Sequence, residues 1–190
     1  MLDSSVLMRR AIRWVCEEHD LTPEALKLID GPTAAAMQDL AIAVADDMQY
    51  NQLKYFRPFE HQRRFFDTGA KDRRGILAAN RIGKTVSTCY ETAMHLTGLY
   101  PEWWEGYRFT KPITCMVAGE GWSQVALVLQ NELLGTNDVK IRDSIGSGAI
   151  PRECIIGDTM RSDGANCIGV EIRHQSGGKS YLLFANYTQE

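Results

Sequence analysis

The chain has 190 residues, enough to bury a core within one main domain, and its 44% hydrophobic and 24% charged content is that of a globular protein. No apolar run is long enough to cross a membrane, and a net charge of −3 argues against a domain that grips DNA over its whole surface. The five Cys and four His are scattered, which disfavours a zinc site and favours reduced, intracellular thiols.

Residues 1–55 are predicted to form an N-terminal helical segment. Ser4 or Ser5 is suited to cap a first helix, and Thr22-Pro23 opens a short second one that ends at Asp30-Gly31-Pro32. A third helix from Thr33 places an apolar stripe on one side: Met37, Leu40, Ala41, Val44 and Met48. Such a stripe favours core packing, and a docking surface for a partner protein is the alternative.

A further helix is predicted to open at Pro58 and to carry Gln62. A Gln amide donates and accepts in one plane, so it is able to read the N6 and N7 edge of adenine. Phe59 and Phe66 are predicted on the same face, where an aromatic ring would stack on the base. The alternative is an exposed Gln that meets only water.

The strongest motif is Gly-Ile-Leu-Ala-Ala-Asn-Arg-Ile-Gly-Lys-Thr at residues 75–85. A short apolar run, predicted as a strand, leads into a polar turn and then into a helix from Val86 to Leu96. Backbone N–H groups and the helix dipole favour an anion at such a corner. The motif therefore predicts a phosphate-binding loop for ATP and Mg²⁺, made of Ala78, Ala79, Asn80, Arg81, Ile82, Gly83, Lys84, Thr85 and Val86.

Each residue type in this loop suits a part of the nucleotide. Lys84 would reach the β- and γ-phosphates, and the Thr85 hydroxyl would hold Mg²⁺. Ala78 stands where the usual pattern has Gly, which changes the loop entrance because a Cβ disfavours the usual turn there. Nearby cations raise the positive potential: Lys71, Arg73, Arg74 and Arg81. The alternative is a plain strand-to-helix corner with a solvated Lys84.

Gly98 is predicted to end the helix that follows the loop. The adjacent Trp103 and Trp104 are predicted to pin the next connection to the core, and the alternative is that they contact a base or a partner. Residues 113–119 read as a central parallel strand, followed by a helix that ends at Gly135. Two successive strand–helix units predict a mostly parallel sheet with helices on its faces.

Residues 137–166 are predicted to be irregular and carry Arg142, Arg152 and Arg161, any of which would be able to reach a neighbouring subunit's nucleotide. A closing hairpin is predicted over 167–187, so the Gly-Lys-Ser at 178–180 is rejected as a phosphate site. No apolar strand ending in Asp-Glu follows the loop. We therefore expect the acidic pair for hydrolysis beyond Glu190, and little or no turnover by these residues alone.

Residues 58–66, 76–85, 99–104 and the hairpin with 187–189 together resemble the N-terminal ATPase region of the large terminase subunit of tailed bacteriophages. The resemblance runs from about Phe56 onward and implies an α/β P-loop NTPase domain (RecA-like/ASCE) over 56–190, with a three-layer core and a C-terminal β-hairpin. It implies a motor that uses ATP to move double-stranded DNA into a procapsid, followed by a nuclease. By this resemblance Lys84 and Arg81 are catalytic, Arg81 acts on the γ-phosphate, and Gln62 is the adenine reader.

The resemblance also implies partners: the small terminase subunit, the portal and double-stranded DNA, with homo-oligomers assembled on the portal in the cytoplasm of the infected bacterium and no membrane contact. A helicase-like DNA translocase ATPase and a non-catalytic nucleotide-binding or partner-docking module remain alternatives. A GTPase is disfavoured because the sequence has no Asn-Lys-x-Asp guanine reader.

Overall fold

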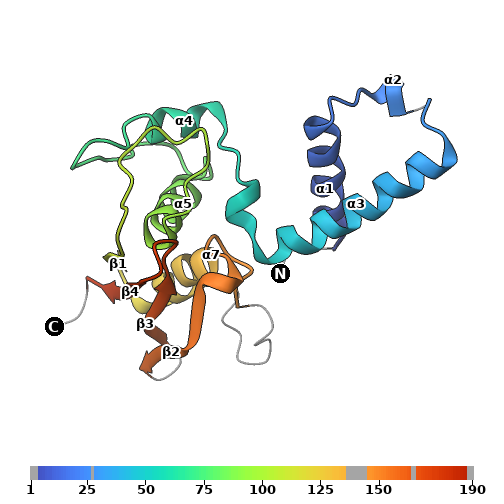
Figure 1. The fold of residues 1–190 in the computed structure, drawn as a ribbon. Coiled ribbons are helices and arrows are strands. Elements are labelled where there is room, and N and C mark those ends of the chain that lie inside the picture. The colour runs from blue at the N-terminus through green and yellow to red at the C-terminus, as the bar shows by residue number, and fades with distance from the viewer. Residues whose placement is uncertain (1–3, 27, 136–144, 164–165, 188–190) are drawn as a thin grey trace. The chain divides into compact units, whose positions relative to one another are not determined.

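The computed structural model describes residues 4–26, 28–135, 145–163 and 166–187, and the chain divides into two compact units, Met1–Tyr50 and Asn51–Glu190. The N-terminal unit contains α1 (Ser4–Glu18), α2 (Pro23–Leu26) and α3 (Gly31–Tyr50) (Figure 1). None of the helices in the described ranges is both long and apolar enough to cross a membrane.

Helices α1 and α3 pack against each other through apolar side chains at helical spacing. The buried residues are Leu7, Ala11 and Val15 of α1 and Ala41, Val44, Ala45 and Met48 of α3. The core reading of the α3 stripe is thus confirmed for Ala41, Val44 and Met48, whereas Leu40 is 39% exposed. Asp30, predicted to end α2, instead caps α3, because its Oδ1 accepts a hydrogen bond from Thr33 N at 2.9 Å.

The second unit mixes helices and strands around one sheet. Its elements are η1 (Gln52–Tyr55), α4 (Glu60–Phe66), α5 (Lys84–Thr97), β1 (Thr114–Gly119), α6 (Trp122–Gln124), the π-helical turn η2 (Val125–Gln130), α7 (Asn131–Leu134), η4 (Arg152–Cys154), β2 (Ile155–Asp163), β3 (Asn166–Arg173) and β4 (Lys179–Asn186). Residues 52–55, assigned from the sequence to the N-terminal helical segment, give Leu53 to the core of this second unit.

Over the described residues the sheet has four strands in the order β1-β4-β3-β2. Strand β1 runs parallel to β4, with Thr114 opposite Tyr181, whereas β4 with β3 and β3 with β2 are antiparallel. The prediction of a mostly parallel sheet is therefore wrong. The closing hairpin is confirmed. Strand β2 adds a third antiparallel strand from residues that were predicted to be irregular. The sequence pattern did not reveal β2, because exposed polar side chains and breaks in register mask its alternation.

The apolar run before the loop does not form the predicted strand. Residues 75–79 have no regular secondary structure and lie outside the sheet, and Leu77 is fully exposed. A strand needs a neighbour to receive its backbone hydrogen bonds. In the described part of the chain no strand pairs with residues 75–79, so this segment has no such neighbour.

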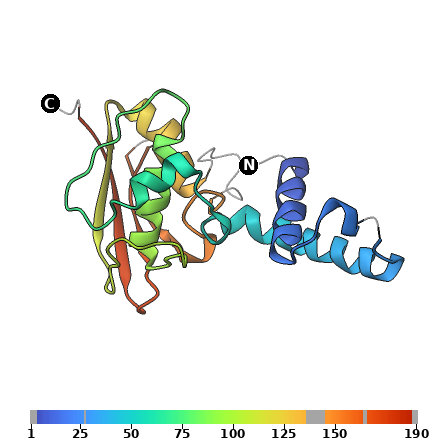
Figure 2. The ribbon, with the colours of Figure 1, turned by 90° about the horizontal axis from the view of Figure 1, so that it is seen from above.

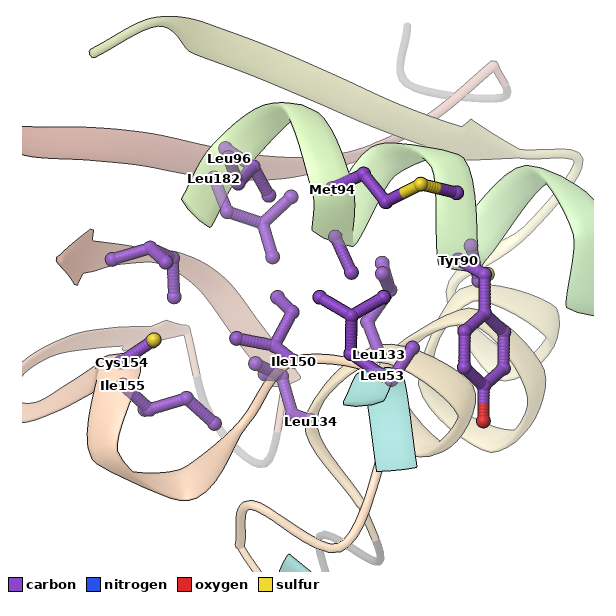
Figure 3. Close-up of a cluster of buried hydrophobic side chains, with 14 of the residues drawn as sticks. Leu53, Tyr90, Met94, Leu96, Leu133, Leu134, Ile150, Cys154, Ile155 and Leu182 are labelled. Atoms are coloured by element: carbon purple, nitrogen blue, oxygen red, sulfur yellow. The ribbon is translucent and has the colours of Figure 1, made fainter. Parts of the chain in front are cut away.

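Helix α5 lies along one face of the sheet and closes the core with α7 (Figure 2). Met94 and Leu96 of α5, Leu182 of β4 and the α7 residues Leu133 and Leu134 meet there (Figure 3). Each of these side chains is completely buried. Burial of apolar surface of this kind is the dominant favourable term in folding.

The connection after α5 is fixed at both ends, as predicted. Gly98 ends the helix with φ +74°, and its N–H donates to Met94 O. Trp104 is 2% exposed and donates from Nε1 to Tyr107 O at 3.2 Å, so this Trp pins the connection to the core. Trp103 is half-buried, with the Arg63 guanidinium 5.1 Å from its ring centre.

Candidate functional site

The corner between residue 78 and α5 is a tight loop with two left-handed residues. Arg81 has φ +63° and Gly83 has φ +86°. A left-handed residue with a Cβ costs about 1 to 2 kcal/mol, so Arg81 marks a turn that the rest of the loop enforces. Among the described residues, Asp20 and Arg81 are the non-glycine positions with positive φ. Ala78 is therefore unstrained, and its Cβ is compatible with this loop entrance.

The loop curls around the side chain of Lys84. The ammonium donates to Ala78 O at 2.7 Å and to Ala79 O at 2.8 Å. A cation thus lies on the inner side of the loop, at the first residue of α5. An anion entering here would meet this charge at once, and phosphate oxygens are able to replace the two carbonyls as its partners.

The N-terminus of α5 adds unpaired donors to that charge. The first helical hydrogen bond runs from Ser87 N to Gly83 O at 2.9 Å. The amides of Lys84, Thr85 and Val86 precede that bond and so have no partner within the helix. They lie at the positive end of the helix dipole, where anions bind well.

Beside the loop an open groove of about 530 Å³ extends along α5. One wall carries Lys84, Thr85, Thr88, Glu91, Thr92 and His95, and the other Phe65, Lys71, Asp72, Arg74 and Ile76. This volume lies within the usual range for small-molecule sites. Of the predicted cations, Lys71, Arg74 and Lys84 line the groove, whereas Arg73 and Arg81 are exposed and do not.

A buried ionic cluster closes the far end of the groove. Glu91, 5% exposed, pairs with the Arg74 guanidinium and accepts a hydrogen bond from His95 Nε2 at 3.3 Å. Burial alone would raise the pKa of Glu91, but the hydrogen bonds from His95 and Arg74 and the charge of Arg74 hold that pKa below its usual value. His95 Nδ1 lies 3.0 Å from the Tyr100 hydroxyl, which accepts from Phe109 N.

This cluster was missed from the sequence, although a signal existed. Glu91 lies seven positions after Lys84, which is the same face of a helix that begins at Lys84, two residues before the predicted start. Its partner Arg74 belongs to the segment before the loop, and only the fold brings the two together.

Gln62 of α4 lies against the loop, but its amide is already engaged. Oε1 accepts from Phe59 N at 2.9 Å, and Nε2 donates to Gly83 O at 3.4 Å. The side chain is 6% exposed. The prediction that Phe59 and Phe66 share a face is wrong, because Phe59 is the N-cap of α4 and is 71% exposed, whereas Phe66 is buried.

The remaining predicted residues divide between this loop and other surfaces. Asn80 and Arg81 are exposed, and Ile82 and Val86 are half-buried. Arg142 lies outside the described residues, and Arg161 packs over the Tyr181 ring in the sheet at 5.8 Å.

No group of three or more His, Cys, Asp or Glu in the described ranges is able to hold a metal. Mg²⁺ would depend on Thr85 and on the phosphates, which are the hard oxygen ligands it prefers.

The chain is similar to the large terminase subunit of Salmonella phage P22, with 34% identity over 114 residues. The match covers 53% of this chain and 22% of that relative, so the chain spans less than a quarter of the relative's length. No protein-family model and no solved structure matches the chain. The similarity supports the terminase resemblance over about half of the sequence.

Proposed function

We propose that this chain is the ATP-binding part of a viral DNA-packaging motor. In this proposal a large terminase subunit couples ATP hydrolysis to the movement of double-stranded DNA into a procapsid. The observation that carries it is the Lys84 ammonium at the N-terminus of α5, which donates to two carbonyls of the loop. The partial similarity to a phage large terminase subunit supports the packaging role.

Different residues of the loop would bind different parts of the nucleotide. Backbone N–H groups over 79–86 would bind the phosphate oxygens, and Lys84 would leave the carbonyls of Ala78 and Ala79 to reach the β- and γ-phosphates. The Thr85 hydroxyl would hold Mg²⁺, which neutralises charge on the phosphates when it is bound. Arg81 is exposed at the tip of the loop, from which it would approach the γ-phosphate.

The partners follow from the same resemblance. The assembled motor would contact the small terminase subunit, the portal and double-stranded DNA, and would form homo-oligomers on the portal in the cytoplasm of the infected bacterium. A nuclease would accompany the ATPase in the same large subunit. The net charge of −3 supports local rather than extensive DNA contact by this part.

The test is the affinity of the chain for ATP with Mg²⁺, measured by titration calorimetry for wild type and two lysine variants. Lys84→Ala is expected to weaken binding at least about 30-fold, because it removes a charge that bonds directly to phosphate. Lys179→Ala is the matched control. Lys179 also follows Gly in a Gly-Lys-Ser sequence, but it lies in the β3–β4 hairpin and pairs with Glu171 at 2.7 Å.

Wild type and Lys179→Ala should therefore bind ATP equally. If Lys84→Ala binds ATP as well as wild type does, while its unfolding temperature is unchanged, the loop is not the nucleotide site.

A further inference from the structure

We propose that His61 and Gln62 are positioning residues that hold the phosphate loop in its binding conformation, so that Gln62 acts on the triphosphate through the loop and not on the base. This inference rests on the proposed nucleotide-binding function. It assigns to Gln62 a role different from the adenine reading expected from the sequence, and the two roles make opposite predictions.

The first turn of α4 holds two consecutive carbonyl groups of the loop. His61 Nε2 lies 2.9 Å from Ile82 O, and Gln62 Nε2 donates to Gly83 O. Because a carbonyl oxygen only accepts, His61 presents its Nε2–H to the loop. The His61 ring stacks on Phe59, with ring centres 5.7 Å apart and planes within 9° of parallel.

Because the peptide bond is planar, these two contacts also set the direction of the N–H groups of Gly83 and Lys84. In a planar trans peptide the C=O and the following N–H point in opposite directions. When Ile82 O points toward His61, the N–H of Gly83 points away from α4. When Gly83 O points toward Gln62, the N–H of Lys84 also points away from α4. Both amides belong to the predicted phosphate cradle.

The Gln62 amide already donates one hydrogen bond and accepts another within the protein. Its Oε1 receives the N–H of Phe59, which completes the capping of α4, while its Nε2 contacts Gly83. A Cβ on Gly83 would lie 2.5 Å from Gln62 Nε2, so the two groups are in direct contact. Reading the N6 and N7 edge of adenine would make a buried side chain, 6% exposed, turn away from these two contacts.

The test compares three ligands that share phosphates but differ in the base: ATP, GTP and inorganic tripolyphosphate, each with Mg²⁺. The variant is Gln62→Met, which keeps the volume of the side chain and removes both hydrogen bonds. We expect the dissociation constants for all three ligands to rise by the same factor, about 3- to 10-fold, as for the loss of one net hydrogen bond. His61→Phe, which keeps the ring and removes the donor, should act in the same direction on all three.

Two outcomes would overturn the inference. A loss of affinity confined to ATP, with tripolyphosphate and GTP unchanged, would make Gln62 an adenine reader. Unchanged affinity for all three ligands would mean that the contact does not shape the loop. If wild type binds none of the three, the proposed function fails and this inference fails with it, whereas a failure of the inference alone leaves wild-type binding and the Lys84→Ala defect intact.

Gln130→Ala separates a positioning role from a stability effect. Gln130 is also a buried glutamine, and its Nε2 donates to Cys167 O at 2.7 Å. Its removal should lower the unfolding temperature and leave all three dissociation constants within about twofold of wild type, because its hydrogen bond goes to β3 and not to the loop. If Gln130→Ala weakened binding as much as Gln62→Met does, general loosening of the fold would explain both.

Discussion

Glu91 connects the segment before the loop to the helix after it. Its carboxylate pairs with Arg74 and accepts from His95, and all three side chains are largely buried. Arg74 also lies over the Phe65 ring at 4.6 Å, so the guanidinium is held on two sides. Such a buried pair is costly to break from one side, because the remaining charge loses its partner.

Replacing Glu91 by Gln is expected to lower the free energy of unfolding by about 1 to 3 kcal/mol at pH 7. The pKa of Glu91 is lower in the folded chain, so its contribution is present above the unfolded-state pKa of about 4.3 and is lost as the pH falls through the folded-state pKa. The difference between wild type and variant should therefore shrink below about pH 4, where protonated Glu91 resembles Gln. Urea unfolding at several pH values measures this.

Glu171→Gln serves as the control for that experiment. Glu171 pairs with Lys179 on the surface, where the lysine side chain is 59% exposed. An exposed pair contributes at most about 1 kcal/mol, so this variant should stay close to wild type at every pH. A pH-independent effect of Glu91→Gln would show that packing, and not the charge, explains its loss of stability.

Helix α5 ends where it does because of one glycine and its neighbour in the hairpin. Gly98 has φ +74°, and a Cβ there would lie 2.6 Å from His174 Nε2. His174 is itself buried, 3.3 Å through Nε2 from Phe109 O. The C-terminus of α5, the connection at Phe109 and the turn after β3 thus meet at His174.

Gly98→Ala is expected to destabilise the second unit by about 2 to 4 kcal/mol, since it adds left-handed strain to a steric clash. Thermal unfolding followed by circular dichroism gives the value. Gly157→Ala in β2 is the control, because nothing lies within 4 Å of the added Cβ and its φ is not positive. Equal stability of the two variants would mean that His174 moves aside without cost.

The elements that were predictable from sequence are those whose signal is local. The α3 stripe, the Gly98 end of α5 and the Gly-rich hairpin turn depend on spacing and on single residues, so the pattern alone located them. The Lys84 loop was recognisable for the same reason. Whether 75–79 forms a strand and which way β2 runs depend on partners that no local pattern encodes.

The engaged state of Gln62 was equally beyond a local pattern. The sequence shows a helix glutamine ahead of a phosphate loop, which suits adenine reading. Only the fold brings its Nε2 to Gly83. The same holds for the contact of Arg74 with Glu91, which joins residues seventeen positions apart.

At the scale of the whole molecule, every residue of the candidate site belongs to the second unit, Asn51–Glu190. A variant lacking residues 1–50 is therefore expected to bind ATP within about twofold of the full chain, since distant and independent parts contribute additively. The measurement is the same calorimetric titration, with Lys84→Ala in both backgrounds as a control. A loss of binding on removal of 1–50 would show that the first unit supports the loop.

Strand β1 pairs with a strand far along the chain, because Thr114 of β1 lies opposite Tyr181 of β4, 67 positions later. A nascent chain leaving the ribosome would thus carry β1 without its partner until β4, residues 179–186, had been made. Long-range pairing of this kind slows folding, and aggregation-prone intermediates therefore persist for longer. Slower translation or a cooler host should for this reason favour recovery of native material.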